Sequence, residues 1–518
     1  MNKLFAFWLV LLSPALAAAQ SESFVVRMGS DTIAVETFVL NAQRLEGELS
    51  GPALQNRMRY QLELSNGRPA RMKVEMIPAN SDTATMRAEL TFLGDSVQLQ
   101  SSSGGAAQPA RRLATSRNAV PFINLAFSFV ELATTHTGRA AGDSAIVQYF
   151  VVTNGATLPA TLKWIAADSA VMSLGGVELR LQLDARGRIL HATVPSQNVT
   201  VERVAGTLQR GAAALPDYTA PANATYTAQD VSIKTAAGHT LAGTLTLPKT
   251  RRGKIPAVVT ISGSGPQDRD ESLIILRGYR PFRELADMLA TRGVAVLRYD
   301  DRGYGASTGV YAAATSADFA ADTRAVLAYL RTRPEIDADK LFLLGHSEGG
   351  LIAPLVAAEE KRLGGIVLLA GPAYPGRKIL EYQTRHGVDL QTEKTAAERD
   401  SLYAAGMRAL DSAAVQQPWM RFFRDHDPVP VLRKVRVPVL IVQGETDRQV
   451  TAEQAGIIAR ELRAAGNGNV AVHVLPGVNH LFLSDPVGNA TGYATLPTRT
   501  VVPQLLQIVG DWIVNHSK

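Results

Sequence analysis

Residues 340–354 read KLFLLGHSEGGLIAP, and this stretch decides how the second half of the chain folds. An apolar run is followed by Gly345-His-Ser347-Glu-Gly349, which matches G-x-S-x-G, and then by small and apolar residues. Between a strand and a helix, this pattern predicts a sharp turn that strains the serine backbone. Glycine is needed at both ends because a side chain there would crowd the turn. We expect Ser347 to stand at the start of a helix, where the Glu348 backbone N–H can face a developing oxyanion.

Strand-like runs alternate with helix-like segments from residue 231 to residue 518. Four of the runs are apolar without alternation, as in strands that are buried on both faces: 257–261, 294–297, 366–369 and 439–442. Helical segments are expected at 279–292, 316–333, 347–360, 451–465 and 501–515, and further strands at 341–344 and 470–475. This order predicts an α/β domain with a mostly parallel sheet and helices on both faces.

A serine nucleophile needs a base, and the chain has nine histidines. In a parallel α/β sheet, ligands bind beyond the carboxyl ends of the strands. His480 lies on a loop just after the last predicted strand, whereas His346 is held within the turn itself. We therefore expect His480 to be the base for Ser347; the alternative is a loop histidine that only forms structural hydrogen bonds.

An acid should orient the imidazole, and Asp447 follows the predicted strand at 439–442, with Glu445 as the alternative. The resulting chain order of serine, aspartate and histidine is that of the α/β-hydrolases and not of chymotrypsin or subtilisin. In this scheme Ser347 attacks, His480 transfers the proton and Asp447 orients the ring.

A second oxyanion donor is expected from the loop after 257–261, which reads SGSGPQDRD at 262–270. We favour the backbone N–H of Ser264, with Gly263 and Gly265 as neighbouring alternatives to it. The loop lacks the lysine of G-x-x-x-x-G-K-[ST], so nucleotide binding is not expected. The charged segment RYDDRGYG at 298–305 is expected to brace neighbouring loops.

The segment at about 371–436 interrupts the alternation and is mostly helical in character. Trp419, Phe422 and Phe423 form an aromatic cluster within it. It is expected to be a helical lid over Ser347. Its aromatic residues either contact the substrate or simply pack the lid onto the sheet.

The N-terminal residues 1–19 read as a secretory signal peptide, with Lys3, an apolar run at 4–12 and small residues at 15–19. The alternative is a membrane anchor, but a membrane span needs about 20 apolar residues. No later segment qualifies as a transmembrane helix. We expect a protein exported to the periplasm or the extracellular space.

Residues 20–206 are predicted to form a β-rich domain of unknown role. Apolar and polar residues alternate at 58–64, 72–76 and 177–183, which indicates an antiparallel sheet folded on itself or covered on one side. A covering helix is expected at 122–132 and a loop of small residues at 101–108. Residues 207–230 are rich in alanine, threonine and proline and are predicted to be a linker to the catalytic domain at 231–518.

The composition excludes several classes of protein. With 518 residues, the chain is long enough for two or three domains. The net charge of +6 is spread along the chain, without the basic clusters of a nucleic-acid-binding protein. The absence of cysteine excludes thiol nucleophiles, disulfides, thiolate metal sites and a lipoprotein anchor. No metal-ligand spacing accompanies the predicted site, so neither a metal nor a cofactor is expected.

Five stretches carry a resemblance to a known family: 262–272 (SGSGPQDRDES), 296–307 (VLRYDDRGYGAS), 345–354 (GHSEGGLIAP), 437–450 (VPVLIVQGETDRQV) and 475–482 (LPGVNHLF). On these motifs the domain at 231–518 resembles the bacterial α/β-hydrolase esterases of the EstD type, which are often grouped with serine aminopeptidases and dienelactone hydrolases. The resemblance implies a carboxylesterase with Ser347 as nucleophile, Asp447 as acid and His480 as base. It does not extend by motif to the β-rich domain.

Three functions follow as hypotheses. The first is a secreted serine hydrolase that cleaves small-molecule carboxylic esters through an acyl-enzyme intermediate. The second is an aminopeptidase or thioesterase with the same triad, in which Asp268, Asp270 or Glu348 could hold a substrate amine. The third is a binding module, formed by the β-rich domain, that carries a vestigial hydrolase. The oligomeric state stays open.

Overall fold

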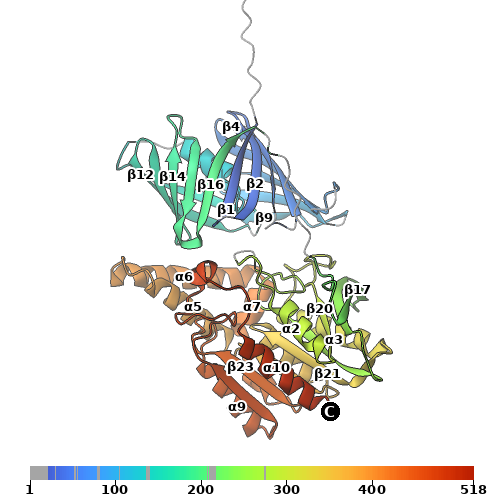
Figure 1. Cartoon of the computed structure of the whole chain (residues 1–518). Helices are drawn as coiled ribbons and strands as arrows, with labels where there is room; N and C mark the ends of the chain where they lie inside the picture. The colour runs from blue at the N-terminus through green and yellow to red at the C-terminus, as the bar shows by residue number, and fades with distance from the viewer. Residues whose placement is uncertain are drawn as a thin grey trace, which may run out of the picture. The chain divides into compact units, whose positions relative to one another are not determined.

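The computed structural model describes residues 21–518 except for 30, 52–53, 55, 79–81, 104, 136–139, 154, 207, 209–216 and 274–275. The chain divides into two compact units, Met1–Leu215 and Pro216–Lys518, each with its own sheet (Figure 1). The predicted signal peptide and most of residues 207–216 lie outside the described residues. Within the described part, no helix is long and apolar enough to cross a membrane.

The described residues of the first unit form one sheet of sixteen strands. The strand order is β10-β11-β12-β13-β14-β15-β16-β1-β2-β3-β4-β5-β6-β7-β8, with β9 also paired to β7. All pairs are antiparallel except β10 with β11. The strands are β1 (Glu22–Met28), β2 (Asp31–Leu40), β3 (Arg44–Ser50), β4 (Asn56–Ser65), β5 (Arg68–Pro78), β6 (Met86–Phe92), β7 (Ser96–Ser103), β8 (Ala106–Ala107), β9 (Arg111–Ala114), β10 (Val120–Phe122), β11 (Ser144–Val151), β12 (Thr157–Ala166), β13 (Ser169–Leu174), β14 (Val177–Leu183), β15 (Ile189–Val194) and β16 (Val199–Ala205).

The period-two pattern places these strands correctly. The three stretches predicted from alternation lie in β4, β5 and β14, and in β14 every second side chain is buried. Asn66 and Gly67 join β4 to β5 with φ of +50° and +73°, a left-handed pair that matches the right-handed twist of a hairpin.

One prediction for this unit is right in kind but displaced along the chain, and another is wrong. The helix expected at 122–132 is α1 (Ser128–Thr135), because Leu125 has a φ of +67° and a residue in that region cannot continue a right-handed helix. The stretch expected as a loop at 101–108 contains the end of β7 and all of β8. Its small residues carry no periodic pattern, and backbone pairing between Ser102 and Ala107 forms the strands instead. A short 3₁₀ helix, Pro195–Gln197, precedes β16.

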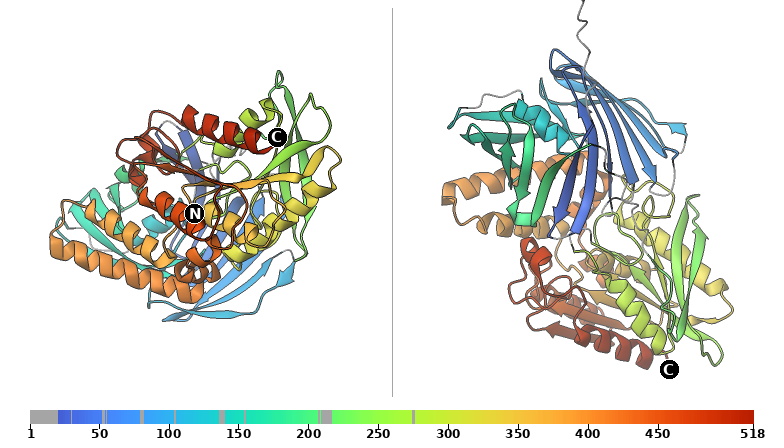
Figure 2. Two further views of the ribbon diagram at one scale, coloured as in Figure 1. Left: turned by 90° about the horizontal axis from the view of Figure 1, so that it is seen from below. Right: turned by 45° about the horizontal axis from the view of Figure 1, so that its top comes forward.

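Helix α1 packs on the apolar face of the sheet, and the right-hand view of Figure 2 shows it in cyan between the green and the blue strands. A carboxyl group is buried beneath it: Glu36 on β2 is fully enclosed. Its oxygens accept from the Ser128 backbone N–H at 3.0 Å, the Ser128 hydroxyl at 2.5 Å and the Tyr60 hydroxyl. Burial raises the pKa of Glu36 from 4.5 to about 7, because these donors do not replace the lost hydration of the charge.

The sheet of the second unit has eight strands among the described residues, in the order β17-β18-β20-β19-β21-β22-β23-β24. Strand β18 is antiparallel to both neighbours and the remaining pairs are parallel. The strands are β17 (Tyr226–Lys234), β18 (Thr240–Pro248), β19 (Ile255–Ile261), β20 (Ala295–Tyr299), β21 (Ile336–His346), β22 (Gly365–Leu369), β23 (Val439–Gly444) and β24 (Val470–Leu475). Strand β17 begins within the predicted linker, because residues 226–230 already pair with β18.

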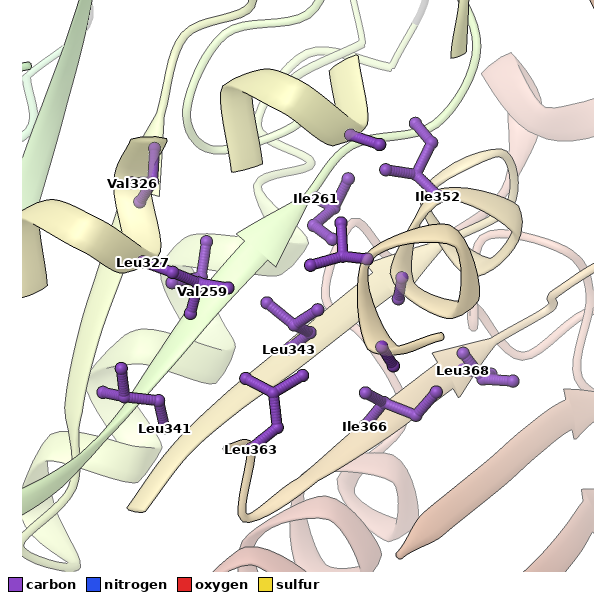
Figure 3. Packing of buried hydrophobic residues seen from close by; sticks show 14 of the residues in the cluster. Val259, Ile261, Val326, Leu327, Leu341, Leu343, Ile352, Leu363, Ile366 and Leu368 are labelled. Carbon is purple, nitrogen blue, oxygen red and sulfur yellow. The ribbon is translucent and has the colours of Figure 1, made fainter. Parts of the chain in front are cut away.

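Helices cover both faces of this sheet, as the unalternating apolar runs predict. One face packs against α2 (Pro281–Thr291) and α10 (Pro503–His516), and the other against α3 (Ser316–Thr332), α4 (Gly349–Ala357) and α9 (Glu453–Ala464). Figure 3 shows the second face. Leu343, at its centre, is fully buried, which stabilises the fold by about 1.5–3 kcal/mol per side chain of this size.

The insertion between β22 and β23 is helical, as predicted. It contains α5 (Gly376–Asp389), α6 (Ala396–Gln416), α7 (Pro418–Asp425) and α8 (Val429–Leu432). Both α6 and α3 begin with a capping box, formed by Thr395 with Glu398 and by Thr315 with Asp318. A 3₁₀ helix, Ala490–Thr495, lies between β24 and α10.

The buried Glu36 predicts a pH-dependent stability for the first unit. The folded state binds the proton more tightly than the unfolded chain does. Glu36 should therefore lower the free energy of unfolding by about 3 kcal/mol as pH rises from 4.5 through 7, and the buried Glu131, whose pKa is raised to about 8, should extend the fall to higher pH. Glu36→Gln should abolish the part of the fall that comes from Glu36. The full chain is unfolded in urea at pH 5 and at pH 8. Hydrogen exchange and mass spectrometry then give the urea midpoint of the region that contains β2.

Glu63→Gln is the matched control, since Glu63 is exposed on the neighbouring part of the same sheet. Its pH profile should follow that of the wild type. A Glu36→Gln profile that kept the full wild-type fall would contradict the assignment of the pH dependence to this carboxyl group.

Candidate active site

Ser347 lies at the tip of the predicted turn, directly between β21 and α4. Its φ of +53° is the strained left-handed conformation expected of a nucleophile elbow. Its backbone N–H donates to the Leu369 carbonyl at 2.8 Å, which ties the turn to β22. A Cβ on Gly345 would lie 2.0 Å from the Gly349 oxygen, and one on Gly349 would lie 2.1 Å from the Ile261 oxygen. The turn therefore exists only with glycine at both positions.

The structure brings His480 and Asp447 together at the same edge of the sheet. His480 Nδ1 lies 2.7 Å from Asp447 Oδ2, and both side chains are buried. Because a carboxylate only accepts, Nδ1 carries a proton, and Nε2 is the ring nitrogen that Asp447 does not contact. Glu445, the alternative acid, is exposed and accepts from the Gly477 N–H at 3.0 Å, away from the imidazole.

Asp447 is held by three further donors. Its Oδ1 accepts from the backbone N–H groups of Gln449 at 2.7 Å and Val450 at 2.9 Å, and its Oδ2 accepts from Gln443 Nε2 at 2.8 Å. A carboxylate with four donors is fixed in orientation, so the ring it holds is fixed as well.

Ser347 and His480 are connected through His346, the last residue of β21, which directly precedes the serine. His346 Nε2 lies 2.9 Å from the His480 carbonyl oxygen. Among the described residues there is no hydrogen bond between the Ser347 hydroxyl and the His480 ring. Such bonds often tighten only when substrate binds.

The loop at 262–270 lies against Ser347, because a Cβ on Gly263 would be 3.3 Å from the Ser347 Cβ. The Gly263 N–H itself donates to Glu271 Oε1 at 2.7 Å, so it is not available to an oxyanion. The N–H groups of Ser264 and Glu348 have no acceptor within the described part of the chain. The pair predicted from the sequence is therefore free to donate.

The charged segment after β20 braces this loop, as expected. Asp301 Oδ1 accepts from the Ser262 hydroxyl at 3.0 Å, and its Oδ2 accepts from the Gln267 N–H at 2.9 Å. Asp300 receives the Arg269 guanidinium at 2.8 and 3.0 Å. Burial raises the pKa of Asp301 well above its usual range, which is the cost of holding a carboxyl group at this position.

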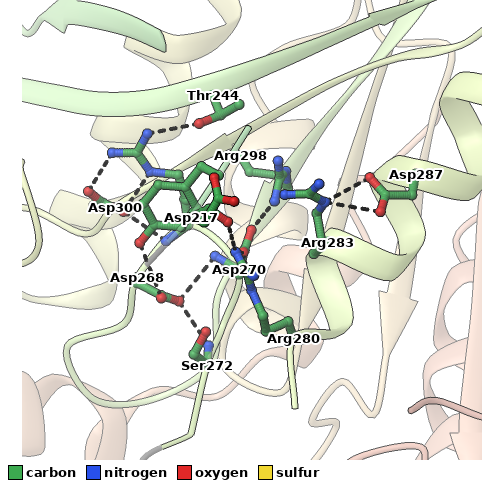
Figure 4. A network of polar contacts seen from close by, with 12 residues as sticks. Asp217, Thr244, Asp268, Asp270, Ser272, Arg280, Arg283, Asp287, Arg298 and Asp300 are labelled. Carbon is green, nitrogen blue, oxygen red and sulfur yellow. Dashed lines mark hydrogen bonds and ion pairs between the residues drawn. The ribbon is translucent and has the colours of Figure 1, made fainter. Parts of the chain in front are cut away.

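A second part of the brace is drawn in Figure 4, where Arg298 and Arg280 converge on Asp270. Asp268 accepts from the N–H groups of Ser272 at 2.9 Å and Asp270 at 3.1 Å. Its other oxygen takes the Tyr218 hydroxyl at 3.3 Å. Asp268 and Asp270 are thus structural and are not free to hold a substrate amine.

The lid meets the elbow through Glu348. Trp419 Nε1 on α7 donates to Glu348 Oε1 at 2.8 Å, and the Ser316 hydroxyl on α3 donates to the same oxygen at 2.6 Å. The side chain is 2% exposed, and burial raises the pKa of its carboxyl group. Trp419 also stacks on Phe423, which packs against Leu351 of α4. These two aromatic residues therefore pack the lid onto the helix that follows the nucleophile.

One residue of the site, Glu271, escaped the sequence analysis, and the role of His346 beyond the turn was not expected. Glu271 closes the donor loop, has a φ of +58° and contacts both Gly263 and His346. It lies in the run DRDES of the donor loop, but its contacts join segments that are far apart in the sequence. No group of three or more metal-ligating side chains occurs within the described residues.

The tight turn predicts a sharp contrast between two glycine substitutions. Gly349→Ala should lower the free energy of unfolding of the second unit by about 3 kcal/mol, because the new Cβ meets backbone that cannot move aside. Gly456→Ala, in α9 with open space around its Cβ position, should raise it by about 0.5–1 kcal/mol. Urea unfolding of the full-length variants measures both. If Gly349→Ala and Gly456→Ala changed the free energy of unfolding equally, the close backbone contact at Gly349 would be contradicted.

Comparison with known proteins supports the resemblance. The family described as "Serine aminopeptidase, S33" matches residues 277–408. Esterase EstD of Thermotoga maritima is 28% identical over 306 residues, which cover 58% of this chain and 70% of EstD. The uncharacterized protein Rv2307c of Mycobacterium tuberculosis is 28% identical over 257 residues, 49% of this chain and 72% of its own.

Among solved structures, the Pyrococcus furiosus esterase Pf2001 aligns with 58% of this chain and 96% of its own, at 16% identity and a TM-score of 0.41. The sheet order, the elbow and the match to EstD agree with the expectation from the motifs. The second unit of the chain has the α/β-hydrolase fold and is similar in sequence to esterase EstD.

Proposed function

We propose that the second unit hydrolyses carboxylic esters of small molecules through an acyl-enzyme intermediate, with Ser347, His480 and Asp447 as its catalytic triad. The observation that carries the proposal is the 2.7 Å contact between His480 and Asp447 at the sheet edge where the strained Ser347 turn lies. With Nδ1 held by Asp447, Nε2 is the ring nitrogen left to act as the general base.

In this mechanism His480 Nε2 takes the Ser347 proton as Oγ attacks the ester carbonyl. The negative charge on the carbonyl oxygen is stabilised by the N–H groups of Ser264 and Glu348, and one such donor is typically worth about 10²–10³ in kcat. The imidazolium, paired with Asp447, then protonates the leaving alcohol. Water, activated by the same ring, hydrolyses the acyl-serine ester and restores the serine.

The acidic residues of the site favour ester substrates over peptides with a free amino terminus, because none of these residues is available to bind the ammonium group. An aminopeptidase must pair the substrate ammonium with a free carboxylate. Asp268 and Asp270 are committed to the loop brace, and burial favours the neutral form of Glu348. Thioesters need no such carboxylate and would use the same triad, so they belong in the substrate panel.

Ser347→Ala should abolish both fluorophosphonate labelling and ester turnover, because no other group supplies the nucleophile. The loss in kcat should be at least about 10⁴-fold. The assay compares p-nitrophenyl esters of increasing chain length with aminoacyl amides and acyl thioesters, and turnover should be highest for short to medium esters. Ser401→Ala, an exposed serine on α6, is the control and should behave as the wild type. Turnover that survives in Ser347→Ala would refute the assignment.

Export through the segment at 1–19 is part of this proposal, supported by its charged, apolar and small-residue regions. The mature chain should begin at residue 18 or residue 20, after one of the small-residue sites at 15–17 and 17–19, and should be found in the periplasm or the medium. N-terminal sequencing of the fractionated native protein tests this. An intact Met1 on cytoplasmic protein would contradict it.

A further inference from the structure

His346, directly before the nucleophile, has an acceptor at each ring nitrogen. Nδ1 lies 2.9 Å from Glu271 Oε1, and Nε2 lies 2.9 Å from the His480 carbonyl oxygen. The His346 and Glu271 side chains are 6% and 3% exposed. Neither nitrogen therefore relies on water, and the two contacts fix the ring in its plane.

The two acceptors determine the protons on the ring. A backbone carbonyl only accepts, so Nε2 carries the proton of its contact with His480. Glu271 Oε1 accepts the Gly263 N–H at 2.7 Å, so the oxygen that faces Nδ1 is already an acceptor, and an acceptor at Nδ1 places a second proton on the ring. The arrangement is that of an imidazolium paired with a carboxylate.

The charged groups around the ring agree with this state. Burial alone would lower the pKa of His346, but the Glu271 carboxylate outweighs it, and Asp447 acts in the same direction, so the pKa is raised. The His480 ring lies 5.0 Å away, and Phe482 covers another side at 5.9 Å. Asp301 and Glu348 are the neighbouring carboxyls, and burial raises the pKa of both. Glu271 and Asp447 are therefore the carboxyl groups that favour the charged form of the His346 ring.

We propose that His346 and Glu271 form a permanently charged buried pair that positions the catalytic groups. Through Nε2 the pair holds the backbone of His480, and through Glu271 it holds Gly263, which faces Ser347. It thereby joins the elbow, the histidine loop and the donor loop, which come from three separate parts of the chain. Both residues act through others and are positioning residues, and the kinetic part of this inference rests on the proposed function.

The protonation state is tested directly by ¹H–¹⁵N NMR of the full chain labelled with ¹⁵N-histidine, with His346→Asn and His346→Gln identifying the signal. Both ring nitrogens of His346 should be protonated at pH 8 in the wild type, and one should lose its proton in Glu271→Gln. A wild-type ring with an unprotonated nitrogen at pH 8 would overturn the charged pair. This readout does not depend on which substrate the enzyme hydrolyses.

The positioning role is tested by kinetics on Glu271→Gln. Misplacing the base and the donor loop should lower kcat for a p-nitrophenyl ester at least about tenfold, with KM changed less than about twofold. Glu461→Gln is the control: Glu461 is paired with Arg433 on the remote helix α9, and its loss should leave both constants unchanged. Unchanged kcat in Glu271→Gln would overturn the role. Absent ester turnover in the wild type would instead refute the proposed function and leave the NMR result standing.

Discussion

The close approach of three backbone segments at the elbow is the constraint on which the rest of the catalytic unit depends. The start of α4 touches both the end of β21 and the end of β19, at distances that exclude any Cβ on Gly345 or Gly349. Since β19 ends at Ile261, the donor loop must begin beside the nucleophile. Leu369, at the end of β22, receives the Ser347 N–H, so the next strand is drawn in as well. One tight turn thus brings the groups of the site to one edge of the sheet.

The loops around that edge are held by buried charge, which is an expensive means of stabilisation. Arg298 is fully buried and donates to Asp270 through Nη1, while its Nε and Nη2 have no partner among the described residues. Burial lowers the pKa of this guanidinium to about 10. Such pairs add little net stability, because the cost of desolvation offsets the attraction. Their role here is to fix geometry. Each arginine and aspartate holds a loop in one position through directional hydrogen bonds, which an apolar residue could not form.

Patterns within single segments were enough to predict most of the fold. The unalternating runs placed the strands of the parallel sheet, and the elbow, His480 and Asp447 followed from their positions after strand ends. What the sequence could not reveal were contacts between distant segments. His346 was set aside as part of the turn, and Glu271 was unnoticed, because their roles arise only when the two loops meet. In the first unit, α1 begins later than predicted because Leu125 has a left-handed backbone conformation. The secondary-structure propensity of leucine gives no sign of that conformation.

The position of the two terminal strands in the first unit affects how its chain can be shortened and how it folds. Its first strand, β1, and its last strand, β16, are neighbours in the middle of the sheet, while the edges come from the interior of the sequence. Removing the first strand would therefore divide the sheet into two halves, whereas terminal trimming of most sheets removes only an edge. The same pairing joins Glu22 to Ala205, so the two halves of the sheet can join only when both ends of the domain are available to pair. Contacts of such long range favour slow, late completion of the fold.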